Sequence, residues 1–319
     1  MDLFALGTPV IDLFARVGRR EVASLGLKQG ATNYFSAGEL AKIERRLKKK
    51  IIHRYAGDNA RNVCEGFAAL GGFCGFQGAV GSDSGGACFE ASLHQCGIAS
   101  FVSAVKGSTG KILALVAQDG QRTFCADLGV SGECRAMERL AFSSSRMFFV
   151  TSITLCCGAP VSALAMKYLE ACKKTGKTAA ISLESAPMVA SHRKFLLSVV
   201  KKYAGVLFMN EEEASALLGA GAERKLRFLK PKMPVYLKRG AHGSKLFLHG
   251  RAQKIGALPA RVTDTTGAGD AYAAGVLYGL TRGYTPLGSA KIGRMLATKV
   301  VKKVGAGIPH PHTRIRHKV

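Results

Sequence analysis

Residues 264–280 read Asp-Thr-Thr-Gly-Ala-Gly-Asp-Ala-Tyr-Ala-Ala-Gly-Val-Leu-Tyr-Gly-Leu, a glycine-bearing turn that runs directly into the small residues of a helix. A helix that begins among glycines presents unpaired backbone N–H groups and the positive end of its dipole, so it binds anions. Gly267, Ala268 and Gly269 let the backbone approach a phosphate, and the carboxylate of Asp270 can orient an alcohol and accept its proton. The stretch predicts phosphoryl transfer to a hydroxyl, with these three residues as an anion hole and Asp270 as the catalytic base. A capped helix after a tight turn is the structural alternative.

Four further blocks follow one another along the chain. They are Gly7-Thr8-Pro9-Val10-Ile11-Asp12, Gly57-Asp58-Asn59-Ala60-Arg61-Asn62, Asn210-Glu211-Glu212-Glu213-Ala214 and Gly240-Ala241-His242-Gly243-Ser244. Together with residues 264–280, they resemble the signature elements of the ribokinase-like (PfkB) carbohydrate and nucleoside kinase family. Five blocks in the right order over most of the chain are more specific than any single motif. The resemblance implies an enzyme that transfers phosphate to an alcohol group.

The acceptor side of the site follows from the same resemblance. It implies that Asp12 and Asn62 fix the acceptor through its hydroxyl groups, with Gly57 and Asp58 beside them. Relatives usually carry a second glycine where this chain has Asp58, and a small residue where it has Arg61. Asp58 therefore either points a new carboxylate at the acceptor or faces away from it. Arg61 either pairs with Asp58 or meets an anionic group on the acceptor.

The donor side is implied in the same way, with ATP and Mg²⁺ as the expected cofactors. The nucleotide-binding residues would be Asn210, Glu213, Lys238, Gly240, Gly243 and Thr266. Asn210 and Glu213 would act on magnesium through its water shell, because this ion prefers to keep several waters. Relatives often hold potassium beside the anion hole, which makes Asp264 a candidate ligand for K⁺. A hydrogen-bonded turn is the alternative for Asp264.

Apolar strands alternate with amphipathic helices along the chain. The strand-like runs are 3–8, 75–80, 146–151, 178–183, 205–209 and 235–238, and the helices include 161–174 and 193–202. This alternation predicts an α/β protein with a mostly parallel sheet covered on both faces, the three-layer ribokinase-like fold, as one domain over residues 1–319. Segments 13–35 and 100–124 break the pattern and resemble the small β lid of the family. Ligands bind at the carboxyl ends of such strands, where we expect Asp12, Asn210, Gly240 and Asp264.

The composition is that of a cytoplasmic enzyme. Hydrophobic residues make up 47% of the 319 residues, but no run approaches the length of a membrane span. The start, Met1-Asp2-Leu3-Phe4, has no basic region ahead of an apolar one, so we expect no signal peptide. Nine cysteines without paired spacing indicate free thiols in a reducing compartment. The oligomeric state, monomer or homodimer, stays open.

The net charge of +25 is larger than an anionic nucleotide requires. Basic residues cluster in 42–54, 224–239, 291–303 and the tail 310–318. Nucleic-acid binding is the alternative function of another class, since basic clusters are its usual footprint. No nucleic-acid module is present in the sequence, and aromatic residues are 8% of it. A solvated basic surface is therefore the favoured interpretation, with a small molecule as the partner.

The acceptor is predicted from one further string. Ser185-Ala186-Pro187 follows a predicted strand and resembles an element of adenosine kinases, as does the spacing Gly7-x-Pro9-x-x-Asp12. This favours a nucleoside phosphorylated at its 5′-hydroxyl. A sugar or sugar acid, such as ribose, fructose or 2-keto-3-deoxygluconate, is the second option. An arginine before Asn62 also occurs in pseudouridine-kinase-like relatives, so pseudouridine stays open.

Overall fold

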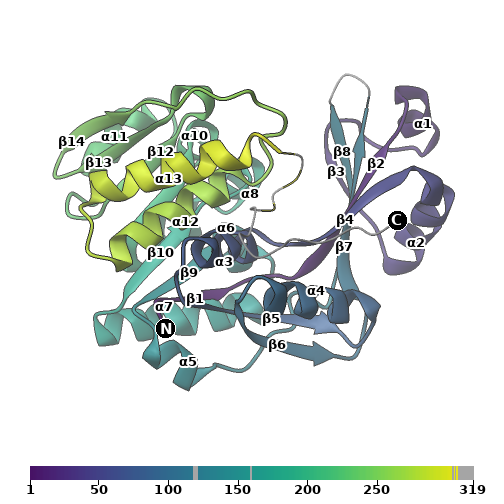
Figure 1. Ribbon diagram of the computed structural model, residues 1–319, viewed down its shortest axis with the longest axis horizontal. Coiled ribbons are helices and arrows are strands. Elements are labelled where there is room, and N and C mark those ends of the chain that lie inside the picture. Colours follow the sequence, from purple (N-terminus) through teal and green to yellow (C-terminus); the bar gives the residue numbers. More distant parts are fainter. Residues whose placement is uncertain (118–120, 159, 304, 306, 308–319) are drawn as a thin grey trace.

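The protein contains two β-sheets (Figure 1). Its structure is a computed structural model, which describes residues 1–117, 121–158, 160–303, 305 and 307. The larger sheet has nine strands in the order β14-β13-β12-β11-β10-β9-β1-β5-β6. In chain order these are β1 (Leu3–Leu6), β5 (Cys74–Gly81), β6 (Ala99–Val105), β9 (Met147–Thr151), β10 (Thr178–Ser182), β11 (Ala204–Asn210), β12 (Val235–Lys238), β13 (Ser244–Leu248) and β14 (Arg251–Ile255). All neighbouring strands from β6 to β12 pair in parallel, and β13 and β14 pair antiparallel at one edge. The six predicted strands are therefore all present, with ends that differ by at most two residues.

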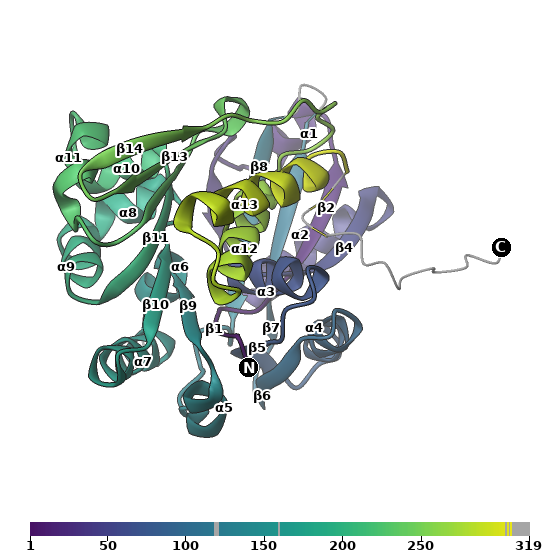
Figure 2. The same ribbon diagram turned by 60° about the vertical axis from the view of Figure 1, so that its left-hand side comes forward.

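Helices cover both faces of this sheet, which confirms the predicted three-layer α/β/α architecture. One face carries α3 (Asn59–Ala69), α4 (Ser84–Gln95), α12 (Ala268–Thr281) and α13 (Pro286–Val300). The other face carries α5 (Arg139–Ser144), α7 (Val161–Thr175), α9 (Arg193–Tyr203), α10 (Glu211–Leu218) and α11 (Ala222–Leu229), and the short helices α6 (Ser152–Cys156) and α8 (Ala186–Ser191) precede α7 and α9 (Figure 2).

Strand side chains alternate between two hydrophobic cores, one beneath each helical layer. On β1, Leu3 and Ala5 belong to the core that includes α3, α12 and α13. Phe4 and Leu6 belong to the core that includes α7, α9 and α10. All four side chains are fully buried. A strand buried on both faces is a continuous apolar run, which is why the sequence shows these strands clearly.

The second sheet has five strands in the order β3-β8-β7-β2-β4. These are β2 (Val10–Arg16), β3 (Thr32–Tyr34), β4 (Ile51–Gly57), β7 (Thr109–Val116) and β8 (Arg122–Gly129), with helices α1 (Arg19–Ser24) and α2 (Ala37–Arg46). We call this sheet with its two helices the lid; it stands beside the large sheet at the right of Figure 1. The chain crosses between the two sheets at residues 7–9, 58, 106–108 and 130.

The predicted lid segments, 13–35 and 100–124, need correction at both ends. Strand β2 begins at Val10 and strand β4 also belongs to the lid, so the first lid segment runs from Val10 to Gly57. Strand β6 pairs with β5 in the large sheet, so residues 100–105 are outside the lid. Strand β8 continues to Gly129. Strand β6 alternates in sequence because it is a half-exposed edge strand, and such a strand cannot be told from a lid strand by its pattern.

Two predicted positions at the strand ends are also corrected. Asp12 does not follow β1; it lies within lid strand β2, because the chain leaves the large sheet at Gly7. Asp264 lies in the loop between β14 and α12, nine residues beyond the last strand residue, Ile255. Asn210 ends β11, and Gly240 follows β12, as expected.

The surface carries most of the predicted basic residues that the structure describes. Lys48, Lys49 and Lys50 are exposed at the end of the lid helix α2, where they form a 3₁₀ turn. The basic tail 310–318 lies outside the described residues. Within the described part of the chain, no helix combines the length and apolar character needed to cross a bilayer.

Candidate active site

The anion hole forms at the start of α12. Gly267 is the N-cap of this helix and has φ of 74°, a left-handed conformation that glycine adopts without strain. The N–H of Ala268 donates to the Thr265 carbonyl oxygen at 3.2 Å. A Cβ atom on Gly269 would lie 3.1 Å from Nζ of Lys238. The predicted anion hole therefore lies at a helix N-terminus, with Lys238 beside Gly269. Of its three backbone amides, that of Ala268 donates to the preceding loop.

Asp270 is buried in the first turn of α12, with only 5% of its surface exposed. Its Oδ2 accepts a hydrogen bond from Nδ2 of Asn62 at 3.0 Å, and its Oδ1 accepts one from Nδ2 of Asn59 at 3.3 Å. Burial, and then the charge of Glu184, raise the pKa of Asp270 to about 7, against the hydrogen bonds and Lys238, which lower it. A carboxylate with this pKa is suited to accept a proton near neutral pH.

Lys238 lies among three carboxyl groups behind the anion hole. Its Nζ is 3.9 Å from Oε1 of Glu184, and both side chains are 14% exposed. Glu184, Glu213 and Asp270 raise the pKa of Lys238, against its burial, so the ammonium stays charged. The cluster holds a permanent cation next to the position where a phosphate would meet Gly269.

Asn210 and Glu213 form the capping box of α10. Oδ1 of Asn210 accepts from the Glu213 N–H, and Oε2 of Glu213 accepts from the Asn210 N–H, both at 2.8 Å. Nδ2 of Asn210 also donates to Oε1 of Glu213. Burial raises the pKa of Glu213 to about 7, against the charge of Lys238. Both carboxylate oxygens are used within the box, so these residues fit a magnesium ion reached through water better than one bound directly.

Asp264 and Thr266 form a hydrogen-bonded turn that also contacts the lid. Oδ1 of Asp264 accepts from the N–H and Oγ1 of Thr266, at 2.9 and 2.7 Å. Arg122 of β8 donates to Oδ1 of Asp264 at 2.8 Å and to Oγ1 of Thr266 at 2.6 Å. The N–H of Gly305 donates to Oδ2 of Asp264. These hydrogen bonds lower the pKa of Asp264 to about 2, against its partial burial. A guanidinium already neutralises the carboxylate, so Asp264 does not fit a K⁺ ligand here.

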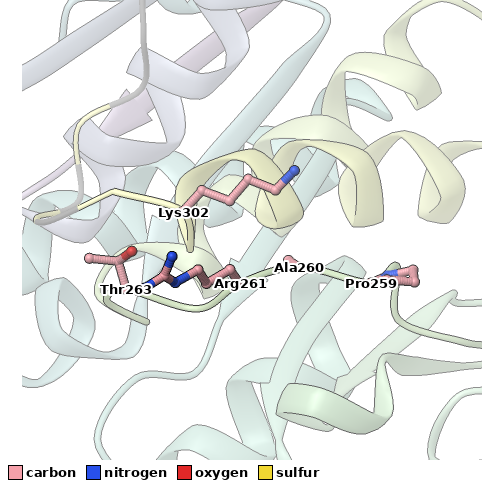
Figure 3. A pocket seen from close by; sticks show the side chains of 5 residues that line it. All are labelled: Pro259, Ala260, Arg261, Thr263 and Lys302. Atoms are coloured by element: carbon pink, nitrogen blue, oxygen red, sulfur yellow. The ribbon is translucent and has the colours of Figure 1, made fainter.

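The loop before Asp264 lines a pocket of about 590 Å³ (Figure 3). Pro259, Ala260, Arg261 and Thr263 form one side, and Lys302, just after α13, forms the other. The predicted nucleotide glycines, Gly240 and Gly243, lie in the turn after β12. Gly243 has φ of 79°, and a Cβ there would lie 2.1 Å from the Ile255 carbonyl oxygen, so this glycine is required by packing alone. Gly240 also has a positive φ, 52°.

The acceptor residues come from the lid and from α3. Asp12 lies against Gly57: a Cβ atom on Gly57 would be 2.2 Å from Oδ2 of Asp12. Burial, and then the charge of Asp58, raise the pKa of Asp12 to about 7, while Arg61 lowers it. Asp58 turns its carboxylate to the backbone of Thr8 and caps α3.

The predicted pairing of Arg61 with Asp58 is wrong. Its guanidinium forms a buried ion pair with Glu65 at 2.7 Å. It also donates to Ser92 and Cys96, which lie on or just after α4. The carboxylate partner of Arg61 is therefore Glu65 and not Asp58.

An aromatic face surrounds Asp12 on the lid. Phe14 lies two residues along β2 and so on the same face, and Tyr55 pairs directly with Asp12 across the sheet. The rings of Phe14 and Tyr55 meet edge to face at 6.0 Å, and His53 stacks on Tyr55 at 5.6 Å. Leu13 faces the opposite way and is buried. The face that carries Asp12 is thus partly exposed and aromatic.

Three residues of the site were not predicted. Asn59 lies three residues before Asn62 on one helix face, a spacing that could have identified it. Glu184 follows β10 at the carboxyl edge of the sheet, where the other site residues lie. Arg122 had no local signal, because its contact with Asp264 joins residues 142 positions apart.

Known proteins are similar to this chain in sequence and in fold. The model of the pfkB family carbohydrate kinases matches residues 20–313. Adenosine kinase from Saccharomyces cerevisiae is 26% identical over 96% of each chain. 5-Dehydro-2-deoxygluconokinase from Shouchella clausii is 26% identical over 78% of this chain and 81% of that protein.

The crystal structure of adenosine kinase from Sinorhizobium meliloti superposes with a TM-score of 0.86, at 24% identity, over 96% of this chain and 95% of the other. At that identity the structure establishes the ribokinase-like fold. The family match extends further, to phosphotransfer onto hydroxyl groups. The chain belongs to the pfkB family of carbohydrate kinases.

Proposed function

We propose that the protein transfers the γ-phosphoryl group of ATP to the 5′-hydroxyl of a nucleoside. The observation that carries this proposal is the first turn of α12, where the anion hole and the buried carboxylate of Asp270 lie within four residues. Asn59 and Asn62 hold this carboxylate from the acceptor side, and Lys238 lies on the donor side. An acceptor hydroxyl and a phosphate would therefore meet at this point.

Asp270 acts as the base in this proposal. With a pKa of about 7, a large share of the Asp270 carboxyl groups is ionised at neutral pH and can accept a proton. The carboxylate orients the hydroxyl for in-line attack, and it takes the proton late because the transition state of phosphoryl transfer is loose. The hydrogen bonds from the two asparagine amides hold the carboxylate in one orientation. Less conformational entropy is therefore lost when the reacting groups are brought together.

The developing negative charge meets the helix N-terminus and Lys238. The N–H groups of Gly267 and Gly269 belong to the first turn of the helix and would donate to phosphoryl oxygens. The N–H of Ala268 would do the same after it gives up its hydrogen bond to the Thr265 carbonyl. The Lys238 ammonium adds a full charge at Gly269. Thr266 stays in the adjacent turn, where Arg122 of the lid donates to it and so joins the lid to the reacting centre.

The donor nucleotide would enter over the loop before Asp264. The pocket between Arg261 and Lys302 offers two cations to a nucleotide. The turn at Gly240 and Gly243 flanks the donor site. Magnesium, when bound, would neutralise the phosphate charge, and Asn210 and Glu213 would reach it through water.

The aromatic face of the lid favours a nucleoside as the acceptor. Phe14 and Tyr55 lie on the face that carries Asp12, where a flat base could stack while Asp12 accepts hydrogen bonds from the ribose hydroxyls. Arg61 is paired with Glu65, which removes the strongest argument for an anionic acceptor. Relatives named as adenosine kinase and as guanosine-inosine kinase point the same way. A relative named 5-dehydro-2-deoxygluconokinase keeps a sugar or sugar acid as the second candidate.

A screen of acceptors tests this proposal. ADP release from ATP and magnesium is measured with adenosine, inosine, guanosine, cytidine, uridine, pseudouridine, ribose, fructose and 2-keto-3-deoxygluconate. We expect the highest kcat/KM with a nucleoside. If only the simple sugars react, the phosphotransfer chemistry stands and the nucleoside proposal is wrong.

A further inference from the structure

Asp58 has a backbone conformation that is normally reserved for glycine. Its φ is 151° and its ψ is 134°, whereas a side chain is rarely tolerated at positive φ. Such a residue persists only where its surroundings hold it firmly, and these residues concentrate at functional sites. The side chain of Asp58 must therefore provide interactions that glycine could not.

The carboxylate of Asp58 joins two of the chain crossings between the sheets. Its Oδ2 accepts from the N–H of Thr8 at 2.7 Å and from Oγ1 of Thr8 at 3.2 Å. Its Oδ1 accepts from the N–H of Arg61 at 2.8 Å and so caps α3. Thr8 lies between β1 and β2, and Asp58 lies between β4 and α3. One side chain thus fixes the path into the lid to the path out of it.

Asp12 is held at the same place by direct packing. A Cβ atom on Gly57 would lie 2.2 Å from Oδ2 of Asp12. A Cβ atom on Gly7 would lie 2.4 Å from Oδ1 of Asp58. Each carboxylate therefore fills the space left by a glycine on the other crossing. A shift of the backbone at Asp58 would move Gly57, and with it the surface against which Asp12 rests.

On the basis of the proposed function, we propose that Asp58 is a positioning residue that fixes the orientation and the charge of Asp12 toward the acceptor. Asp12 is the lid residue assigned to the acceptor hydroxyls, whereas the Asp58 carboxylate is engaged by Thr8 and by the N–H of Arg61. The charged or titratable groups around the pair are Arg61, which favours ionised Asp12, and the thiols of Cys64 and Cys157, on which the Asp58 charge acts. The Asp58 charge opposes ionisation of Asp12, so its removal makes Asp12 ionise at lower pH.

Asp83 provides a matched control at another crossing between the two sheets, the one that leads into β7. It caps α4 through the N–H of Gly86 at 2.8 Å, and it accepts from the N–H and Oγ1 of Thr109, the first residue of β7, at 2.9 and 2.5 Å. This is the same set of hydrogen bonds that Asp58 makes with Arg61 and Thr8. Asp83 has an ordinary backbone, with φ of −136°, and it does not contribute to the pKa of Asp12.

The experiment compares Asp58→Asn with Asp83→Asn, using whichever acceptor the wild type phosphorylates fastest. We expect Asp58→Asn to raise the acceptor KM at least about tenfold and kcat to change by less than about threefold, since a lost hydrogen bond to a charged group has this size. The pH at which the acceptor KM improves should also fall below that of the wild type. Asp83→Asn should lower the thermal midpoint but leave both the KM and its pH dependence unchanged.

Two measurements separate this inference from the proposed function. NMR titration of the Asp12 carboxyl needs no turnover, and its midpoint should fall in Asp58→Asn but not in Asp83→Asn. Asp58→Gly, which suits the backbone and removes the carboxylate, should fold and reproduce the KM effect if Asp58→Asn does not fold. Equal behaviour of the Asp58 and Asp83 variants, with stability as the only change, would overturn the inference. A failure of every nucleoside as acceptor would leave it intact.

Discussion

Replacement of Asp270 by asparagine removes the base and keeps the shape of the side chain. The amide oxygen can still accept from Asn62, so the first turn of α12 should keep its geometry. We expect kcat to fall at least about a hundredfold, the lower limit of typical general-base contributions. In the wild type, kcat should decline as the pH falls below about 7, because protonated Asp270 cannot accept the proton.

The same substitution should stabilise the protein at high pH. The folded-state pKa of Asp270 is raised to about 7 from 3.8, so the folded protein binds this proton more tightly than the unfolded chain. Its stabilising contribution is therefore present below pH 3.8 and is lost as the pH rises to about 7. A shift of about three units corresponds to at most ~4 kcal/mol. We expect Asp270→Asn to gain roughly 2–4 kcal/mol at pH 8 and little at pH 4.

The assay for this prediction has two parts. Urea unfolding at pH 4, 6 and 8 gives the stability difference, and single-turnover phosphorylation gives the rate of the chemical step. If the variant is less stable than the wild type at pH 8, the buried negative charge of Asp270 does not destabilise the folded protein. A near-normal chemical rate would remove Asp270 from the role of base.

Three further predictions concern the donor, the acceptor and the cation. Lys238→Met should lower kcat at least about tenfold, because a charge-assisted contact is lost. Lys245→Met on β13 should not, because that ammonium pairs with Glu223; equal rates of both variants would contradict the role of Lys238. Phe14→Ala should raise KM about three- to tenfold for a nucleoside, from the loss of ring stacking, with no effect on a simple sugar; a parallel rise for both would rule out base stacking. The rate of the wild type should be equal in potassium and in a bulky organic cation, because Arg122 already neutralises Asp264; potassium activation would refute this.

Much of the fold could be predicted because its strands carry a strong local signal. Strands such as β9 and β11 are buried on both faces and are continuous apolar runs between polar turns. The chemistry of α12 was also local, since the glycines of the anion hole and Asp270 are adjacent in sequence. The capping box of Asn210 and Glu213 was visible for the same reason.

The remaining features depend on contacts between distant segments. The chain passes from the large sheet to the lid within Gly7 to Pro9, and no local pattern distinguishes this crossing from the end of a single strand. Arg122 reaches Asp264 only after the lid has folded against α12. The roles of Asp58 and Arg61 were left open by the sequence, and the packing of α3 against α4 and the first crossing decides them.

The most direct test of the central claim is identification of the product by mass spectrometry after incubation with ATP, magnesium and the nucleoside panel. We predict a nucleoside 5′-monophosphate formed in equal amount with ADP by the wild type, and both products formed at least about a hundredfold more slowly by Asp270→Asn. Formation of ADP without a phosphorylated nucleoside, or an undiminished product from Asp270→Asn, would contradict the account.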